Sequence, residues 1–208
     1  LFSATHALIE ANELGWSDPL IVGMLVASAV LTVSFLLFER RSPKAMLPLR
    51  FFRIPAFSAG ATVAFSVSFG MFATFFFMSL YMQLIRGYSA FQAGVRFLPM
   101  TVLIIVTAPN AGRYASKHGS RIPMTFGLLL AGTGLLLLSR ISIDTPYLLM
   151  APVFAIMGIG IGATMAPMTA AVMNAVGPER AGLGSATTNS AREVGGVFGI
   201  ALLGTILT

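Results

Sequence analysis

Two adjacent charged residues, Arg192 and Glu193, stand in a segment that is apolar from Val194 onward, and Asn189 lies one helical turn before them. Glu193 is the only acidic residue within the segments that we expect to cross a membrane. Because desolvation favours the protonated form of a buried carboxylate, Glu193 is a candidate proton carrier. Arg192 and Asn189 are candidates for the same coupling site or for a substrate path. The alternative is that Glu193 stays at the inner interface and pairs with a basic loop residue as a structural lock.

Four prolines lie inside two of the expected membrane helices, Pro99 and Pro109 in one, Pro152 and Pro167 in the other. A proline removes a backbone hydrogen bond and bends a helix, and bent helices often flank the substrate path of a transporter. Asn110 follows Pro109. Its amide is either a further substrate-path candidate or a partner for backbone groups that the proline leaves free.

Small residues four positions apart let two helices approach closely in lipid. Gly158 with Gly162 and Gly195 with Gly199 have this spacing. They predict either ordinary helix packing or a seam along which helices slide during transport.

The residue inventory argues against an enzyme. No HExxH, GxSxG or GxxxxGK pattern is present, and neither His6 nor His118 stands where it could be the base for a Ser or Asp at membrane depth. The chain has no cysteine and only these two histidines, so we expect neither a metal site nor an organic cofactor. A channel or a non-transporting membrane scaffold stays open, although no ring-forming filter motif is present.

Composition places the chain in the membrane class. Of its 208 residues, 56% are hydrophobic and 10% are charged, against about 25% charged in soluble domains. The net charge of +6 comes from Lys and Arg in short loops between apolar runs. That distribution is typical of a protein whose partner is the lipid bilayer, and it argues against nucleic acid.

Crossing the hydrocarbon core takes about 20 helical residues. Six apolar runs reach or approach that length, at 20–38, 56–83, 91–111, 122–139, 146–173 and 184–207. We therefore predict an all-α, polytopic transmembrane helix bundle with about six spans, preceded by the tail of an earlier helix. Both ends of the chain resemble interrupted helices, so we expect a fragment of a longer protein.

The loops predict the orientation of the bundle. Those at 39–55 and 112–121 are rich in Arg and Lys, whereas residues 1–19 have neither. The positive-inside rule makes these basic loops cytoplasmic in a multi-pass protein of the cell (inner) membrane, and Trp16, Tyr81, Tyr88 and Tyr147 then fall at the outer interface. We expect 39–55 to be an amphipathic linker with its apolar side toward lipid and its arginines toward lipid phosphates. The alternative is a regulatory or partner-binding segment.

The segment 112–121, Gly-Arg-Tyr-Ala-Ser-Lys-His-Gly-Ser-Arg, resembles the loop motif of the major facilitator superfamily, Gly-x-Leu-Ala-Asp-Arg-x-Gly-Arg-Arg, in its C-terminal copy. The resemblance implies that the loop takes part in conformational switching. Ser116 stands where the motif has its acidic residue, so the charge-relay lock attributed to that residue does not carry over. The residues assigned to the loop motif are Gly112, Arg113, Lys117, Gly119 and Arg121.

Further segments are similar to the fourteen-helix drug:proton antiporter branch of this superfamily (the EmrB/QacA type). They lie at 7–16, 46–57, 88–99, 178–182 and 189–199. The resemblance implies three parts. Residues 1–38 would be the end of one transmembrane helix plus the next, 39–55 a cytoplasmic linker, and 56–208 a C-terminal bundle lacking its last helix.

The same resemblance implies two bundles that rock about a midplane site, with proton entry driving export. The expected function is secondary active transport, namely proton-coupled export of small amphipathic or cationic compounds of the multidrug efflux type. The expected partners are protons, a small-molecule substrate and the missing N-terminal bundle of the same protein. The closest alternative is a facilitator-type importer or uniporter of a metabolite.

Overall fold

The computed structural model describes residues 6, 7, 10, 11, 15, 17–41, 49–143 and 145–207, and every regular element within them is helical. Apolar runs of this length fold as helices because, in lipid, each segment must satisfy its own backbone groups. The elements follow in chain order: α2 (Pro19–Arg41), η1 (Leu49–Arg53), α3 (Pro55–Leu80), η2 (Tyr81–Ile85), α4 (Ala90–Arg96), α5 (Leu98–His118), α6 (Arg121–Leu138), α7 (Tyr147–Val176), η3 (Pro178–Arg180) and α8 (Ala181–Leu207).

The predicted all-α membrane fold is confirmed. Four segments are long and apolar enough to cross a membrane, namely α2, α3 continued by η2, α6 and α7, and the bent pair α4–α5 forms a fifth. The sixth predicted run, 184–207, lies within α8, a helix of 27 residues whose first half carries Thr, Asn, Arg and Glu side chains. The protein is therefore a multi-pass membrane protein.

The predicted run 91–111 is not one helix, which corrects that prediction. Ser89 caps α4 in a reciprocal capping box with Gln92, and α4 ends at Arg96. Phe97 joins α4 to α5, Pro99 lies in the first turn of α5, and the two axes differ by 42°. Because proline fits the first turn of a helix, where no backbone donor is needed, Pro99 begins a new helix instead of bending an existing one.

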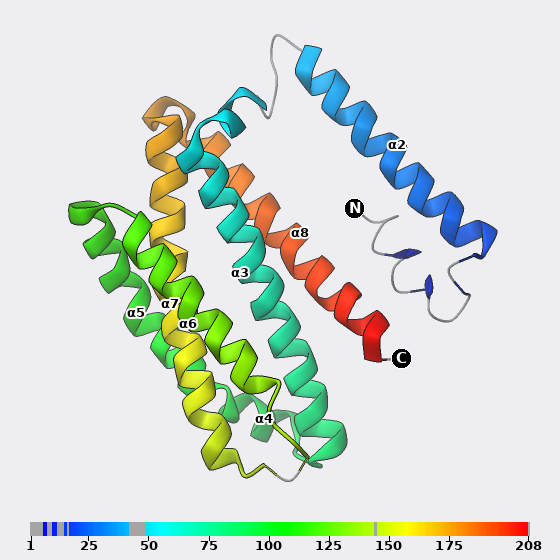
Figure 1. Cartoon of the computed structure of the whole chain (residues 1–208), viewed down its shortest axis with the longest axis vertical. Helices are drawn as coiled ribbons and strands as arrows, with labels where there is room; N and C mark the ends of the chain where they lie inside the picture. Colours follow the sequence, from blue (N-terminus) through cyan, green and yellow to red (C-terminus); the bar gives the residue numbers. More distant parts are fainter. Residues whose placement is uncertain are drawn as a thin grey trace.

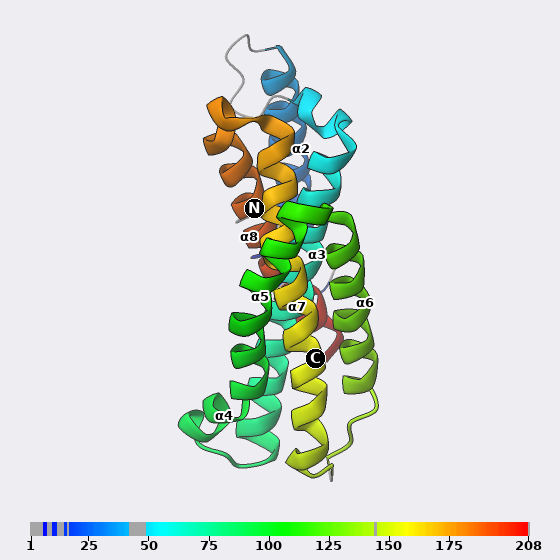
Figure 2. The same ribbon diagram turned by 90° about the vertical axis from the view of Figure 1, so that its left-hand side faces the viewer.

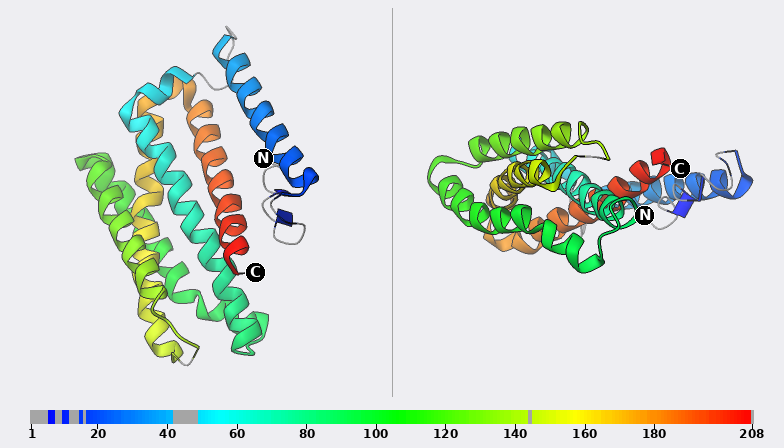
Figure 3. Two further views of the ribbon diagram at one scale, coloured as in Figure 1. Left: turned by 45° about the vertical axis from the view of Figure 1, so that its right-hand side comes forward. Right: turned by 90° about the horizontal axis from the view of Figure 1, so that it is seen from below.

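Helices α3 and α7 form the centre of the bundle (Figures 1 and 2). Helices α5 and α6 pack along α7, α8 packs along α3, and α3 and α7 contact each other. Met100, Phe154 and Met157 are almost completely buried in the core between these helices. Helix α2 lies beside the bundle (Figure 3) and packs through Ile21 on residues 7 and 11, with only 6% of its apolar stretch buried.

Alternating helix directions place the loops at two ends (Figure 1). Element η1, the α5–α6 connection and η3 share one end, which we call the basic end; its described basic residues are Arg50, Arg53, Arg113, Lys117, His118, Arg121 and Arg180. Element η2, α4 and the α6–α7 connection share the opposite end, with Tyr81, Tyr88 and Tyr147. Trp16 lies outside the described residues.

Three of the spaced glycines stand where two helix backbones meet. A methyl group on Gly158 would overlap the carbonyl oxygen of Met100 in α5. One on Gly195 or Gly199 would overlap the carbonyl oxygen of Phe65 or Phe69 in α3. A methyl group on Gly162 would lie 2.9 to 3.1 Å from atoms of Ile104 and Thr107 in α5. These glycines set the α5–α7 and α3–α8 distances.

The described part of the linker differs from its prediction. Phe51 of η1 does not face lipid, because it is 7% exposed and packs against Phe57 of α3 and Val172 of α7. The ring gains aromatic and aliphatic contacts there that fluid acyl chains do not offer. Phe52 keeps the expected exposure at 38%. Residues 42–48 of the predicted linker lie outside the described residues.

Candidate functional site

Arg192 is a half-buried guanidinium between α8 and α7. Its Nη2 donates to the hydroxyl oxygen of Thr169 on α7 at 3.3 Å, and that hydroxyl donates to the carbonyl oxygen of Met165 at 3.0 Å. Its Nε is buried and has no hydrogen-bond partner among the described residues. A guanidinium at membrane depth is costly unless its donors are satisfied, so Arg192 retains capacity to bind an acceptor.

Glu193 faces away from Arg192, because successive residues of an α-helix point about 100° apart. Its side chain is exposed, as is that of Asn189 one turn earlier on the same face of α8. Within the described part of the chain, no basic residue forms an ion pair with Glu193. The structure thus brings Glu193 and Asn189 onto one uncovered polar face, with Arg192 at its edge.

Two observations bear on the two interpretations of Glu193. It stands 12 residues after Ala181, where α8 begins, which corresponds to about 18 Å along the helix axis. Its side chain is exposed, so the burial expected of a proton carrier is not met among the described residues. The ion pair expected of a structural lock is not formed there either, and both interpretations stay predictions.

Asn110 does not join this group. It lies on α5, whereas α8 packs mainly against α3 and α7. Its Nδ2 donates to the carbonyl oxygen of Val106 at 2.8 Å, one turn earlier in the same helix. The amide therefore bonds within its own helix, and its acceptor is not the Ile105 carbonyl oxygen that Pro109 leaves without a donor. Pro109 and Pro167 are both interior to their helices, and Pro167 is buried two residues before Thr169.

Most of the loop motif is helical, which corrects the predicted loop at 112–121: residues 112–118 end α5, and only Gly119 and Ser120 connect it to α6 at the basic end. Gly112 lies against Ala166 of α7, 3.1 Å from where a methyl group would stand, and Gly119 ends α5 with φ +90°, a value that L side chains rarely adopt. The side chains of Arg113, Lys117 and Arg121 are all exposed. The hydroxyl of Ser116 donates to the carbonyl oxygen of Arg113 at 2.8 Å. Ser116 therefore binds local backbone where the motif has an acid.

At the opposite end, Arg96 is held between two tyrosines. Its guanidinium carbon lies 3.7 Å from the ring centre of Tyr88 and 5.4 Å from that of Tyr147, whose hydroxyl donates to the Arg96 carbonyl oxygen at 2.9 Å. Cation–π contacts of this kind hold the guanidinium against the two rings. The hydrogen bond from Arg86, opposed by desolvation and aided by the charge of Arg96, lowers the pKa of Tyr88.

At the same end, the side chains of Tyr81 and Arg86 form hydrogen bonds to backbone carbonyl oxygens of the α6–α7 connection. The Tyr81 hydroxyl lies 3.1 Å from the carbonyl oxygen of Ser142 and 3.3 Å from that of Ile143. Arg86 donates to the Ile143 carbonyl oxygen at 2.6 Å. These contacts tie η2 and the residue after it to the connection between α6 and α7.

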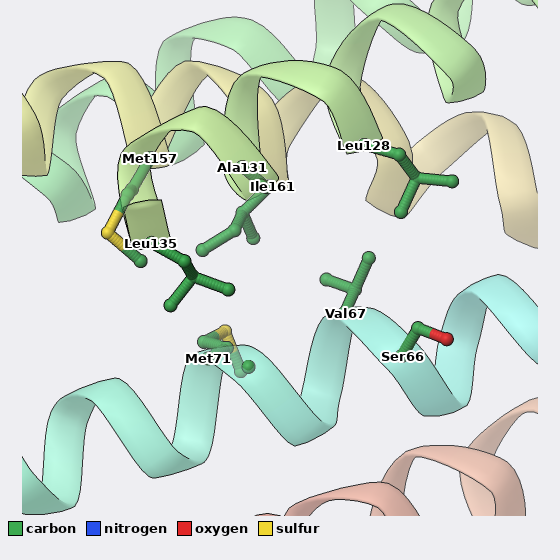
Figure 4. A pocket seen from close by; sticks show the side chains of 10 residues that line it. Ser66, Val67, Met71, Leu128, Ala131, Leu135, Met157 and Ile161 are labelled. Atoms are coloured by element: carbon green, nitrogen blue, oxygen red, sulfur yellow. The ribbon is translucent and has the colours of Figure 1, made fainter. Parts of the chain in front are cut away.

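A cavity of about 140 Å³ lies between α3, α6 and α7 (Figure 4). Its lining is almost entirely apolar, with Val67, Met71, Leu135, Met157 and Ile161 pointing into it. None of the predicted polar site residues lines it. An apolar cavity without convergent polar groups can take an apolar group but supplies no charge chemistry.

Sequence reasoning missed Thr169 and the tyrosines around Arg96 as partners of charged groups. Thr169 lies 23 residues before Arg192, and no helical periodicity relates positions on two different helices. The tyrosines were expected at the outer interface, and that expectation could have suggested a cation–π partner for Arg96.

Comparison with known proteins agrees with this architecture. The sequence profile of the Major Facilitator Superfamily matches residues 7–200. The chain is 33% identical over 207 residues to the methylenomycin A resistance protein of Streptomyces coelicolor, covering 100% of this chain and 44% of the relative. It is 31% identical over 207 residues to the tetracenomycin C resistance and export protein of Streptomyces glaucescens, covering 100% and 38%.

A third relative is the puromycin resistance protein of Streptomyces alboniger, which is 35% identical over 212 residues, covering 100% of this chain and 42% of the relative. The chain thus spans less than half the length of these curated relatives. Its profile match, its helical fold and the alignment of the whole of this chain to these relatives agree. The chain belongs to the Major Facilitator Superfamily.

Proposed function

We propose that the chain acts as the C-terminal half of a secondary active transporter that exports small amphipathic or cationic compounds in exchange for protons. The observation that carries the proposal is the carboxylate of Glu193, exposed at mid-helix depth on α8 beside the half-buried Arg192. An ionisable residue on a membrane helix is a candidate for coupling proton movement to alternation between two bundles. The relatives named for resistance and export favour the outward direction.

In this proposal Glu193 takes up a proton when the face of α8 opens to the outside and releases it when the face opens to the cytoplasm. Arg192 is held in place by its hydrogen bond to Thr169 and lies at the edge of the same polar face. Asn189 adds a neutral hydrogen-bonding group for substrate on the same face. Substrate and proton then compete for one polar surface, which couples their movements.

Glu193→Gln in the full-length transporter is expected to abolish substrate-driven proton flux, because the amide cannot bind and release a proton. The measurement is the change of internal pH in proteoliposomes, normalised to folded protein. Glu179→Gln is the matched control, since Glu179 is also exposed but lies in η3, outside the membrane helices. Proton flux that is unchanged in Glu193→Gln removes this residue from the coupling site.

We further propose that the basic end faces the cytoplasm of a cell (inner) membrane, in line with the positive-inside rule. The chain has no cysteine, so single Cys substitutions report location cleanly. In intact cells, a membrane-impermeant maleimide is expected to label Ser142→Cys, at the tyrosine end, and to leave Ser116→Cys, at the basic end, unlabelled. After lysis both should react, because both side chains are exposed. The opposite pattern in intact cells would reverse the orientation.

A further inference from the structure

The 3-10 helix η1 is anchored to the basic end of the bundle by one buried ring. Phe51 lies with its ring centre 5.8 Å from that of Phe57 and packs against Val172 in the cluster that Ile54 and Val176 complete. A ring with 7% exposure holds the backbone on either side of it in place. The neighbours of Phe51 therefore occupy defined positions at the inner ends of α3, α7 and α8.

Two arginines from distant parts of the chain converge on that ring. The guanidinium carbon of Arg50 lies 5.6 Å from the Phe51 ring centre, and that of Arg180, in η3, lies 5.4 Å from it. Their guanidinium carbons therefore cannot be more than about 11 Å apart, the limit set by these two contacts. Arg53 ends the same turn of η1 and adds a third cation.

These like charges are not neutralised within the described residues. Arg50, Arg53 and Arg180 are all exposed, and none forms an ion pair with a described carboxylate. Glu179 precedes Arg180 in the chain but makes no such bond with it. Repulsion among cations gathered around one ring is relieved when an anion binds between them.

The surroundings indicate which anion fits. The site lies where α3 and α8 begin, which is the headgroup level of a membrane protein. Phe52 is 38% exposed beside it and offers an apolar surface to an acyl chain. A free phosphate would gain nothing from that surface, whereas a lipid would use both parts of the site.

We propose that Arg50 and Arg180, which contact the Phe51 ring, together with Arg53 at the end of η1, form a binding site for the phosphate headgroup of an anionic glycerophospholipid. The lipid bridges η1 to η3 and so connects the segment before the bundle to the connection between α7 and α8. Its binding requires neither Glu193 nor proton coupling. The proposal therefore stands or fails separately from the transport function.

The test is photocrosslinking of the full-length protein in nanodiscs with a phosphatidylglycerol analogue that carries a diazirine near its headgroup. Peptides from 49–58 and 178–184 are expected to be labelled, and that labelling should fall roughly twenty-five-fold in the Arg50→Gln/Arg180→Gln variant. Each basic residue at an anionic leaflet contributes about five-fold to binding. The corresponding phosphatidylcholine analogue should label these peptides weakly, and millimolar inorganic phosphate should not compete.

The matched control is Arg113→Gln/Lys117→Gln, which removes the same charge from the other loop at this end. It should leave labelling at 49–58 and 178–184 unchanged. If both double variants lose the same amount of labelling at 49–58 and 178–184, the lipid is attracted by the overall charge of this end and not by a specific site. If the phosphatidylcholine analogue labels these peptides equally, the site does not select an anionic headgroup. Competition by inorganic phosphate would assign the site to a free ion. Gel filtration of each variant shows whether the protein remains folded, and Arg→Lys at both positions should restore labelling.

Discussion

Alanine at position 195 is expected to lower the stability of the bundle by about 2 to 3 kcal/mol. The added methyl group would overlap the carbonyl oxygen of Phe65 on α3, and a backbone atom cannot move aside as a flexible side chain can. Alanine has the higher helix propensity by about 1 kcal/mol, so the steric cost has to exceed that gain for the sign to be unfavourable. Gly199→Ala should act in the same way against Phe69, one turn further along the same contact.

Gly132→Ala is the matched control, because no heavy atom lies within 4 Å of the added methyl group on this α6 residue. It should be neutral or stabilise the chain by up to about 1 kcal/mol. Unfolding by sodium dodecyl sulfate, followed by circular dichroism, measures both variants on one scale. If Gly195→Ala unfolds at the same detergent fraction as Gly132→Ala, then α8 does not approach α3 as closely as described.

Arg192→Met is expected to change stability and function in opposite directions. In the 208-residue chain it should raise stability by about 1 to 3 kcal/mol, because methionine has no donors to leave unsatisfied in place of the buried Nε. Under the proposed function it should reduce transport by the full-length protein at least tenfold, because the proposed coupling face loses the cation at its edge. A combined unfolding and vesicle transport experiment measures both effects. A large loss of stability in the chain alone would show that Arg192 is fully paired there.

Thr169→Val provides the check on that interpretation. It removes the acceptor that Arg192 uses on α7 and keeps the side-chain volume. In the otherwise unchanged chain it should cost about 1 kcal/mol or more, since another guanidinium donor loses its partner. In the Arg192→Met background it should cost less, and the difference is the coupling energy of the pair.

The spans could be predicted from the sequence because the bilayer imposes both their length and their helical form. The run 122–139 corresponds to α6, Arg121–Leu138, and the run 20–38 lies within α2, Pro19–Arg41. The break at Phe97 was not predicted. Proline at 99 is compatible with a bend inside one helix or with the first turn of a second one, and the choice depends on where α4 packs.

The candidate site was predictable in its residue types and not in its geometry. Glu193 stands out in the sequence because a carboxylate is rare within an apolar helix. Which side of α8 it occupies depends on the glycines at 195 and 199, which turn the opposite side toward α3. Asn110 is likewise a polar residue within an apolar helix, yet its amide donates to the carbonyl oxygen of Val106 in the same helix. A polar residue type therefore predicts a site only when the packing of its helix is known.

The hydrogen bonds that hold the α6–α7 connection affect which residues can vary in evolution. Tyr81 and Arg86 bind carbonyl oxygens of Ser142 and Ile143, and every residue type carries that oxygen. Side chains at 142 and 143 can therefore drift among homologous sequences while the segment keeps its place. The two donors have no such freedom, because few residue types reach across with a hydroxyl or a guanidinium. We therefore expect homologous sequences to vary more at positions 142 and 143 than at Tyr81 and Arg86.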